Sequence, residues 1–199
     1  MALLALLLLI FLFGRGAHAK CAIEPVDGYV TIPNDDKSIA NNAFQQCTNL
    51  KSITIPATVK SIGQYAFQGC TSLEIVTFID AAGLETIGRN AFAGCDNLTT
   101  LSIPNTVTSI GQSAFSGCSS LENIHFNVDS AVTSIGDNAF ALCTALTTLK
   151  LPSTLTSIGD GAFNGAIKLR HLVISSSTFT FGKDSLNGTK LEDQPNVSP

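Results

Sequence analysis

Short stretches in which apolar and polar residues alternate recur along most of the chain. Residues 50–56, for example, read Leu-Lys-Ser-Ile-Thr-Ile-Pro. Alternation with a period of two and with β-branched apolar residues predicts a short strand that buries one face. Proline then ends the strand because it has no N–H to donate to a neighbouring strand. The inward-facing residues of the expected strands are Val30/Ile32, Ile53/Ile55, Val76/Phe78, Leu101/Ile103, Ile124/Phe126, Leu149/Leu151 and Leu172/Ile174.

The pattern repeats at a nearly constant interval. Self-similarity at a period of 20–30 residues is typical of a solenoid, in which each unit buries its apolar side only against its neighbours. The spacings alternate, so a 48-residue pair of units is the larger repeat. The longer units contain proline-free loops at residues 79–84 and 127–132. Ala-Phe pairs mark the units at residues 43–44, 66–67, 91–92, 114–115, 139–140 and 162–163, with spacings of 23, 25, 23, 25 and 23 residues.

The second half of each unit turns the chain back. Ser61-Ile62-Gly63 predicts a second extended piece and then a sharp corner, which glycine permits because it has no Cβ. Residues 64–70 are too few for a stable isolated helix, so they are predicted to form one helical or 3-10 turn held by packing. The predicted fold is therefore an α/β repeat solenoid. A parallel sheet of about seven short strands forms one face, and helical or 3-10 turns form the opposite face.

Residues at equivalent positions of stacked units line up in columns, and two columns are predicted to form the core. Neighbouring cysteines in such a column point the same way, which disfavours disulfides and favours buried free thiols. Disulfides are the alternative, since exported proteins commonly contain them. Cys21 lies three residues out of register and is the candidate to bridge, with Cys47 as the partner. The predicted core columns are Phe44, Phe67, Phe92, Phe115, Phe140 and Phe163, and Cys47, Cys70, Cys95, Cys118 and Cys143.

The N-terminus has the pattern of a secretory leader. Residues 3–13 are an unbroken apolar run, and Ala17-His18-Ala19 follows. Eleven residues are too few to span a bilayer but match a signal peptide cleaved after Ala19. An uncleaved signal anchor is the alternative. The expected organisation is a signal peptide at 1–19, an N-terminal cap and first degenerate repeat at 20–47, regular repeats at 48–169, a C-terminal degenerate repeat or cap at 170–191, and a polar tail at 192–199.

The repeat itself resembles a known family. Its consensus, Leu-x-x-Ile-x-Ile-Pro-x-x-Val-x-Ser-Ile-Gly-x-x-Ala-Phe-x-Gly-Cys, resembles the BspA-like class of leucine-rich repeats over roughly residues 28–190. The two proline-free loops and both end repeats depart from it. The resemblance implies secreted or surface proteins of bacteria and microbial eukaryotes, several of which are associated with adhesion to host or matrix proteins. It implies no catalysis and no fixed set of binding residues.

Composition, charge and residue spacing argue against several classes of function. Only 13% of the residues are charged, with 11 basic against 15 acidic, which argues against nucleic-acid binding. His125 and His171 are expected to face outward while the thiols face inward, so Cys–His catalysis is not expected. No spacing of Cys and His matches a metal site, and no cofactor is expected. Asp80 and Asp129 occupy equivalent loops, where solvated carboxylates are favoured over a shared calcium ion.

The outward positions of the strands form the candidate binding face. A row of hydroxyls there is equally consistent with a merely solvated sheet. The predicted function is a non-enzymatic extracellular binding or adhesion module, secreted or at the cell surface, which recognises a protein or glycan through this face. A self-assembling structural component of a cell wall or matrix is the alternative, and the low charge favours self-association. The candidate ligand-binding residues are Thr54, Thr77, Ser102, Asn123, His125, Thr148, Lys150 and His171.

Three Asn-x-Ser/Thr sequons mark sites where N-glycosylation would occur on a eukaryotic secretory route. Their asparagines are Asn97, Asn187 and Asn196.

Overall fold

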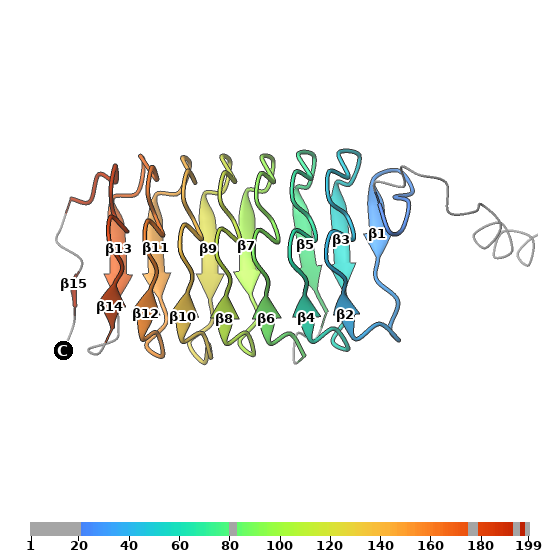
Figure 1. Cartoon of the computed structure of the whole chain (residues 1–199), viewed down its shortest axis with the longest axis horizontal. Coiled ribbons are helices and arrows are strands. Elements are labelled where there is room, and N and C mark those ends of the chain that lie inside the picture. Colours follow the sequence, from blue (N-terminus) through green and yellow to red (C-terminus); the bar gives the residue numbers. More distant parts are fainter. Residues whose placement is uncertain (1–20, 80–82, 175–178, 193–195, 198–199) are drawn as a thin grey trace, which may run out of the picture.

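The computed structural model describes residues 21–79, 83–174, 179–192 and 196–197, and every regular element in them is a β-strand. The strands lie in two columns along a solenoid whose rungs follow one another in chain order (Figure 1). The predicted signal peptide at 1–19 lies outside the described residues, as does Asp80. Within the described ranges there is no helix of the length and hydropathy needed to cross a bilayer.

The first column contains the strands that the alternating pattern predicts. Their pairing is parallel, and its register equals the sequence repeat, so that Thr54 lies beside Thr77. A last short strand, β15 (Asn196–Val197), pairs with the end of this column. The column consists of β1 (Tyr29–Thr31), β3 (Ser52–Ile55), β5 (Ile75–Phe78), β7 (Thr100–Ile103), β9 (Asn123–Phe126), β11 (Thr148–Leu151) and β13 (His171–Ile174).

The first column is not one continuous sheet. Ladders join β1–β3–β5, β7–β9 and β11–β13–β15, but in the described part of the chain no ladder joins β5 to β7 or β9 to β11. In Figure 1, β5 and β7 stand visibly farther apart than β3 and β5. Both interruptions fall at 25-residue steps. The expected seven-stranded sheet is therefore split into three segments.

The interrupted steps combine two features that weaken pairing. At the intact step from β3 to β5, the Ile79 N–H donates to the Ile55 carbonyl at 2.9 Å. Pro104 and Pro152 occupy the position of Ile79 after β7 and β11, and proline has no N–H to donate. The strand before each interruption also leads into one of the longer loops, which relaxes the constraint on its spacing from the next rung.

The second column forms the continuous sheet of the molecule. Its strands are two residues long and pair in parallel through seven rungs. A glycine follows most of them, and a Cβ on Gly111 would lie 2.7 Å from the backbone of Gly88. The rungs can therefore approach closely only because these positions lack side chains. The strands are β2 (Ser38–Ile39), β4 (Ser61–Ile62), β6 (Thr86–Ile87), β8 (Ser109–Ile110), β10 (Ser134–Ile135), β12 (Ser157–Ile158) and β14 (Thr180–Phe181).

The predicted helical and 3-10 turns are wrong. Residues 64–70 and their equivalents are successive non-helical turns, and no helix occurs among the described residues. The backbone N–H groups of Tyr65, Phe67 and Gly69 donate to carbonyls of the following rung. A helix would direct those donors to its own carbonyls and leave the next rung unpaired. Left-handed φ angles at Tyr65 (58°) and Gly69 (71°) produce this arrangement.

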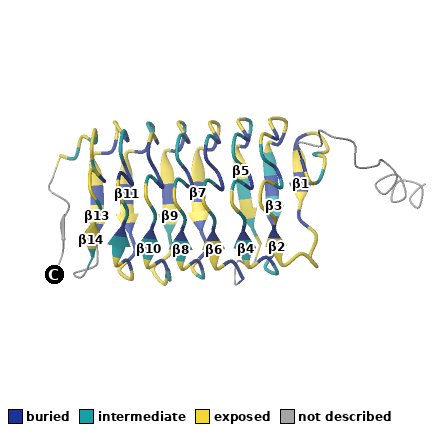
Figure 2. Ribbon diagram, viewed as in Figure 1, coloured by how far each residue is buried: buried dark blue, intermediate teal, exposed yellow. Residues whose placement is uncertain are grey.

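The interior is built from columns of stacked side chains. Six phenylalanine rings, from Phe44 to Phe163, lie parallel with centroids 4.9–5.6 Å apart, and each is at most 1% exposed. Beside them lie four buried free thiols, Cys70, Cys95, Cys118 and Cys143. Each thiol donates a hydrogen bond to a phenylalanine carbonyl of the preceding rung, which satisfies its polar atom. In Figure 2, buried residues recur from rung to rung in both columns.

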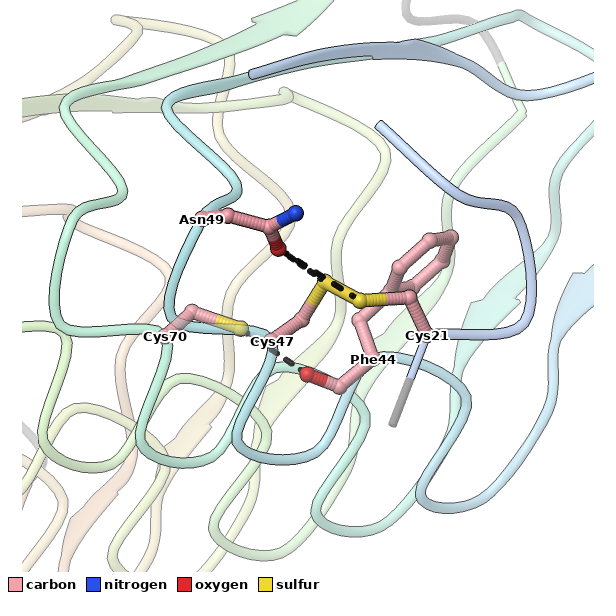
Figure 3. Close-up of a disulfide and its surroundings, with 5 residues drawn as sticks. All are labelled: Cys21, Phe44, Cys47, Asn49 and Cys70. Carbon is pink, nitrogen blue, oxygen red and sulfur yellow. Dashed lines mark hydrogen bonds between the residues drawn. A yellow bond between two sulfur atoms is a disulfide. The ribbon is translucent and has the colours of Figure 1, made fainter. Parts of the chain in front are cut away.

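A disulfide closes the N-terminal end of these columns. The predicted bridge is confirmed: Cys21 is joined to Cys47 with a Cα–Cα distance of 5.4 Å. Figure 3 shows the disulfide beside the ring of Phe44. The Asn49 Oδ1 atom lies 3.7 Å and 3.4 Å from the two sulfurs, contacts that involve no thiol hydrogen. Phe44 is consequently buried although it belongs to the first rung.

The buried thiols predict a loss of stability in alkali. Burial raises the pKa of the Cys70 thiol from 9.0 to about 12, and burial also raises the pKa values of Cys95 and Cys143. Above pH 9 the unfolded chain releases these protons while the folded chain retains them. Stability from this source is therefore complete below pH 9 and declines between pH 9 and 12. Urea unfolding at pH 8, 9 and 10 measures the decline, and Cys70→Ala should make it shallower. Equal slopes for the two proteins would contradict the prediction.

Candidate functional site

The outward side chains of the first column form a face of parallel rows. All eight residues predicted for the binding face lie on it, seven of them exposed and Thr54 half-buried. Strand register sets their neighbours, for example Ser102 beside His125 and Thr148 beside His171. The two rows are Thr31, Thr54, Thr77, Ser102, His125, Lys150 and Val173, and Tyr29, Ser52, Ile75, Thr100, Asn123, Thr148 and His171.

The interruptions of the sheet divide these residues into three groups. Thr54 and Thr77 belong to the first segment and Thr148, Lys150 and His171 to the last. Ser102, Asn123 and His125 lie between them on β7 and β9. The structure therefore places the predicted residues on one face but does not gather them into a single cluster.

A groove lies at each interruption. The first groove has a volume of about 400 Å³, and the second has a volume of about 150 Å³. The first is lined by Val76, Thr77, Phe78, Thr100, Ser102, Ile103, Pro104 and Asn127. The second is lined by Phe126, Asn127, Val128, Lys150, Leu151, Pro152 and Ser153.

Sequence reasoning missed most of the groove walls. Phe78 and Phe126 pack against the core as the alternation predicts, but both are only half-buried and also line the grooves. The sequence predicts only that Pro104 and Pro152 end strands, and the structure shows that they also line the grooves. The sequence feature that coincides with both grooves is the 25-residue spacing between consecutive repeats.

The charges on the face are unevenly paired. The Glu192 carboxylate lies 2.8 Å from the Arg170 guanidinium and 3.9 Å from Nε2 of His171, at the C-terminal end of the face. Lys150 forms no ion pair with any described residue. Lys150 is therefore the unpaired cation of the second groove.

Other candidate chemistry is dispersed over the molecule. The described His, Cys, Asp and Glu side chains form no group of three or more that could hold a metal ion. His125 and His171 are exposed on the face, whereas the free thiols are buried. Asn97 and Asn187 of the sequons are exposed, and Asn196 lies in β15.

Several threonine hydroxyls support the fold rather than the face. The Oγ1 atoms of Thr108, Thr133 and Thr156 donate to backbone carbonyls of the preceding rung at 2.9–3.2 Å. Such bonds tie consecutive rungs together beside the second column. These three hydroxyls therefore stabilise the stacking of the rungs.

Comparison with known proteins identifies the repeat. The chain matches the family described as the BspA type leucine rich repeat region (6 copies), over residues 14–129 and 85–194. The chain belongs to the BspA-type leucine-rich repeat family. This BspA-type protein matches none of the curated proteins closely enough to be called a relative.

Solved structures of bacterial proteins share the architecture of this BspA-type protein. A leucine-rich repeat protein of T. pallidum is 32% identical, with a TM-score of 0.74 over 83% of this chain and 78% of that one. The pneumococcal vaccine antigen PcpA is 27% identical, with a TM-score of 0.64 over 72% of this chain and 38% of that one. A leucine-rich cell surface protein of Faecalibacterium prausnitzii is also 27% identical, with a TM-score of 0.55 over 86% and 50% of the two chains.

Proposed function

We propose that this chain is a non-enzymatic binding module, secreted or displayed at a cell surface, which recognises an extracellular protein or glycan through the exposed face of its first strand column. One observation carries the proposal. The face is long, open and grooved, and seven of its eight candidate residues are exposed. The phenylalanine and cysteine columns, in contrast, are buried in the core. Extended sheet surfaces of solenoids commonly serve as binding sites.

Two further observations support the proposal. One similar solved structure is described as a cell surface protein and another as a vaccine antigen. The predicted leader at residues 1–19 is consistent with export. A Cys–His hydrolase gains no support, because the described free thiols are buried and burial holds the pKa of Cys70 near 12.

The test is capture of partners by the secreted protein followed by substitution of the face. The folded protein is applied to extracellular matrix, host-cell and glycan surfaces, and captured partners are identified by mass spectrometry. The triple variant His125→Ser/Lys150→Ser/His171→Ser should lose at least tenfold in affinity. Lys183→Ser, an exposed cation after β14, is the matched control and should bind normally. No saturable binding by the folded protein, or equal loss in the control, would overturn the proposal.

Self-assembly is the second candidate, and the ends of the second column favour it. Among the described strands, β2 and β14 each have a neighbour on one side only. Phe181 on β14 is 36% exposed. Edge strands with apolar side chains are sites of association between chains. Light scattering over a concentration series measures this directly, and a monomer at every concentration would exclude a self-assembling structural role.

A further inference from the structure

The two grooves are formed by equivalent positions of the repeat. Each lies between a strand that ends in phenylalanine and a strand followed by proline, namely Phe78 with Pro104 and Phe126 with Pro152. The 48-residue block relates the two sets, since Phe78 corresponds to Phe126 and Pro104 to Pro152. A ligand with its own matching repeat would therefore meet equivalent walls in both grooves.

The chemistry of the grooves favours a ligand that is apolar and rich in acceptors. Phenylalanine, proline and aliphatic side chains form the apolar walls. The polar side chains can all donate: hydroxyls such as those of Thr77 and Ser102, the amide of Asn127 and the ammonium of Lys150. No carboxylate occurs among the described residues that line either groove. A proline-rich segment has this character, because each prolyl amide keeps its carbonyl acceptor and loses its N–H donor.

The spacing of the grooves favours one extended conformation of a polypeptide ligand over another. The grooves lie two rungs apart, and in the continuously paired second column two rungs span roughly 10 Å at the usual strand separation of about 4.8 Å. Three residues of a polyproline II helix rise about 9.3 Å and return to the same side of the helix. An extended β-strand rises about 10 Å over three residues, but residues three apart then point to opposite sides. Of these two extended conformations, the polyproline II form is the one that presents residues i and i+3 to both grooves.

The charge of the second groove favours an acidic ligand. Ser102 in the first groove corresponds to Lys150 in the second. Lys150 has no ion-pair partner in the described part of the chain. An acidic side chain of the ligand would complement it. The chain as a whole is acidic, with a formal charge of −4, so this attraction is local to the groove.

We propose that the two grooves together bind an acidic, proline-rich polypeptide segment in the polyproline II conformation. The segment runs along the solenoid axis across β5 to β11, places prolines i and i+3 in the first and second grooves, and sets a carboxylate beside Lys150. This inference rests on the proposed function, because it specifies the partner class for the same face. Aromatic-lined grooves are a recurring means of recognising polyproline II segments.

Synthetic peptides test the proposal. A fluorescein-labelled (Pro-Pro-Glu)4 peptide is titrated with the secreted protein and followed by fluorescence anisotropy. The equally charged, flexible peptide (Gly-Ser-Glu)4 is the control. We expect (Pro-Pro-Glu)4 to bind about tenfold tighter or more, since its conformation is already set before binding. Equal affinities for the two peptides would overturn the proposal.

Exchange of the corresponding residues separates groove binding from general charge attraction. Lys150→Ser should weaken (Pro-Pro-Glu)4 binding by about fivefold or more, and Ser102→Lys should strengthen it by about threefold. Lys183→Ser removes the same charge elsewhere and should leave affinity unchanged. Phe126→Leu, at a half-buried ring, should weaken binding with the thermal midpoint preserved to within a few degrees. An equal effect of Lys150→Ser and Lys183→Ser would overturn the proposal.

The same variants distinguish this inference from the proposed function. If a captured extracellular partner binds the face but is insensitive to Lys150→Ser and Phe126→Leu, the general binding role stands and the groove assignment is wrong. If no partner binds and the peptides also fail, both are wrong.

Discussion

Replacing Phe115 by alanine is expected to lower the free energy of unfolding by about 3–5 kcal/mol. The ring is completely buried in the middle of the column and stacks on Phe92 and Phe140 at 5.3 Å on either side. Its removal leaves a cavity between two flat rings, which the rungs cannot close because their backbones are already hydrogen-bonded to each other. Urea unfolding monitored by circular dichroism measures the change.

The matched control for Phe115→Ala is the same substitution at Phe126. That ring is half-buried at the edge of the second groove, so its removal exposes less apolar surface and leaves a space that water can fill. The loss should therefore be clearly smaller than at Phe115. Equal losses, or a loss below about 1 kcal/mol at Phe115, would show that the column does not carry the stability assigned to it.

The strands could be located from the sequence because the alternation of apolar and polar residues coincides with the strands of the structure. Alternation fixed which residues face inward, and Pro56 or its equivalents fixed where strands end. The inward residues Ile53, Leu101 and Leu149 are all buried accordingly. Columns followed directly from the constant register, since residues one repeat apart must stack when strands pair in parallel.

The non-helical turns at residues 64–70 and their equivalents are also marked in the sequence. Left-handed backbone occurs at the second residue after Ile-Gly or its equivalent, where the chain has Asn42, Asn90, Asn138, Gly161 and Asp184 among others. Asn, Asp and Gly are the residue types that tolerate this conformation best. Read as a column, they indicate recurring non-helical turns. Tyr65 occupies the same column and conceals the pattern when one repeat is considered alone.

The interrupted sheet and its grooves lay beyond the sequence for a different reason. The 25-residue spacing was visible, but whether two extra residues bulge outward or separate the strands depends on backbone pairing between rungs. That pairing includes the bond that the Ile79 N–H donates to the Ile55 carbonyl and that Pro104, at the equivalent position, cannot donate. The exposed rows of the candidate site were therefore predictable from alternation, whereas the grooves required the structure.

Removing the disulfide by Cys21→Ser/Cys47→Ser is expected to cost about 3–4 kcal/mol, the usual magnitude for a bridge that closes a loop of this length. The two cysteines are separated by 26 residues. The disulfide holds residues 21–28 against the first rung, where Phe44 has no earlier ring to stack on and is nevertheless buried. Its loss should therefore act first on the N-terminal rungs. Hydrogen exchange should accelerate in residues 29–55 before it does in the central repeats.

Reduction of the unaltered protein provides the matched control for this prediction. Dithiothreitol should lower the unfolding midpoint of the wild-type chain but leave that of the double serine variant unchanged, because the variant has no disulfide to reduce. The four remaining cysteines are free and buried in the wild-type chain and form no disulfide that dithiothreitol could reduce, so they do not contribute to the difference. A wild-type midpoint unaffected by reduction, or six titratable thiols in the secreted protein after denaturation without reductant, would show that the N-terminal end is held by packing alone.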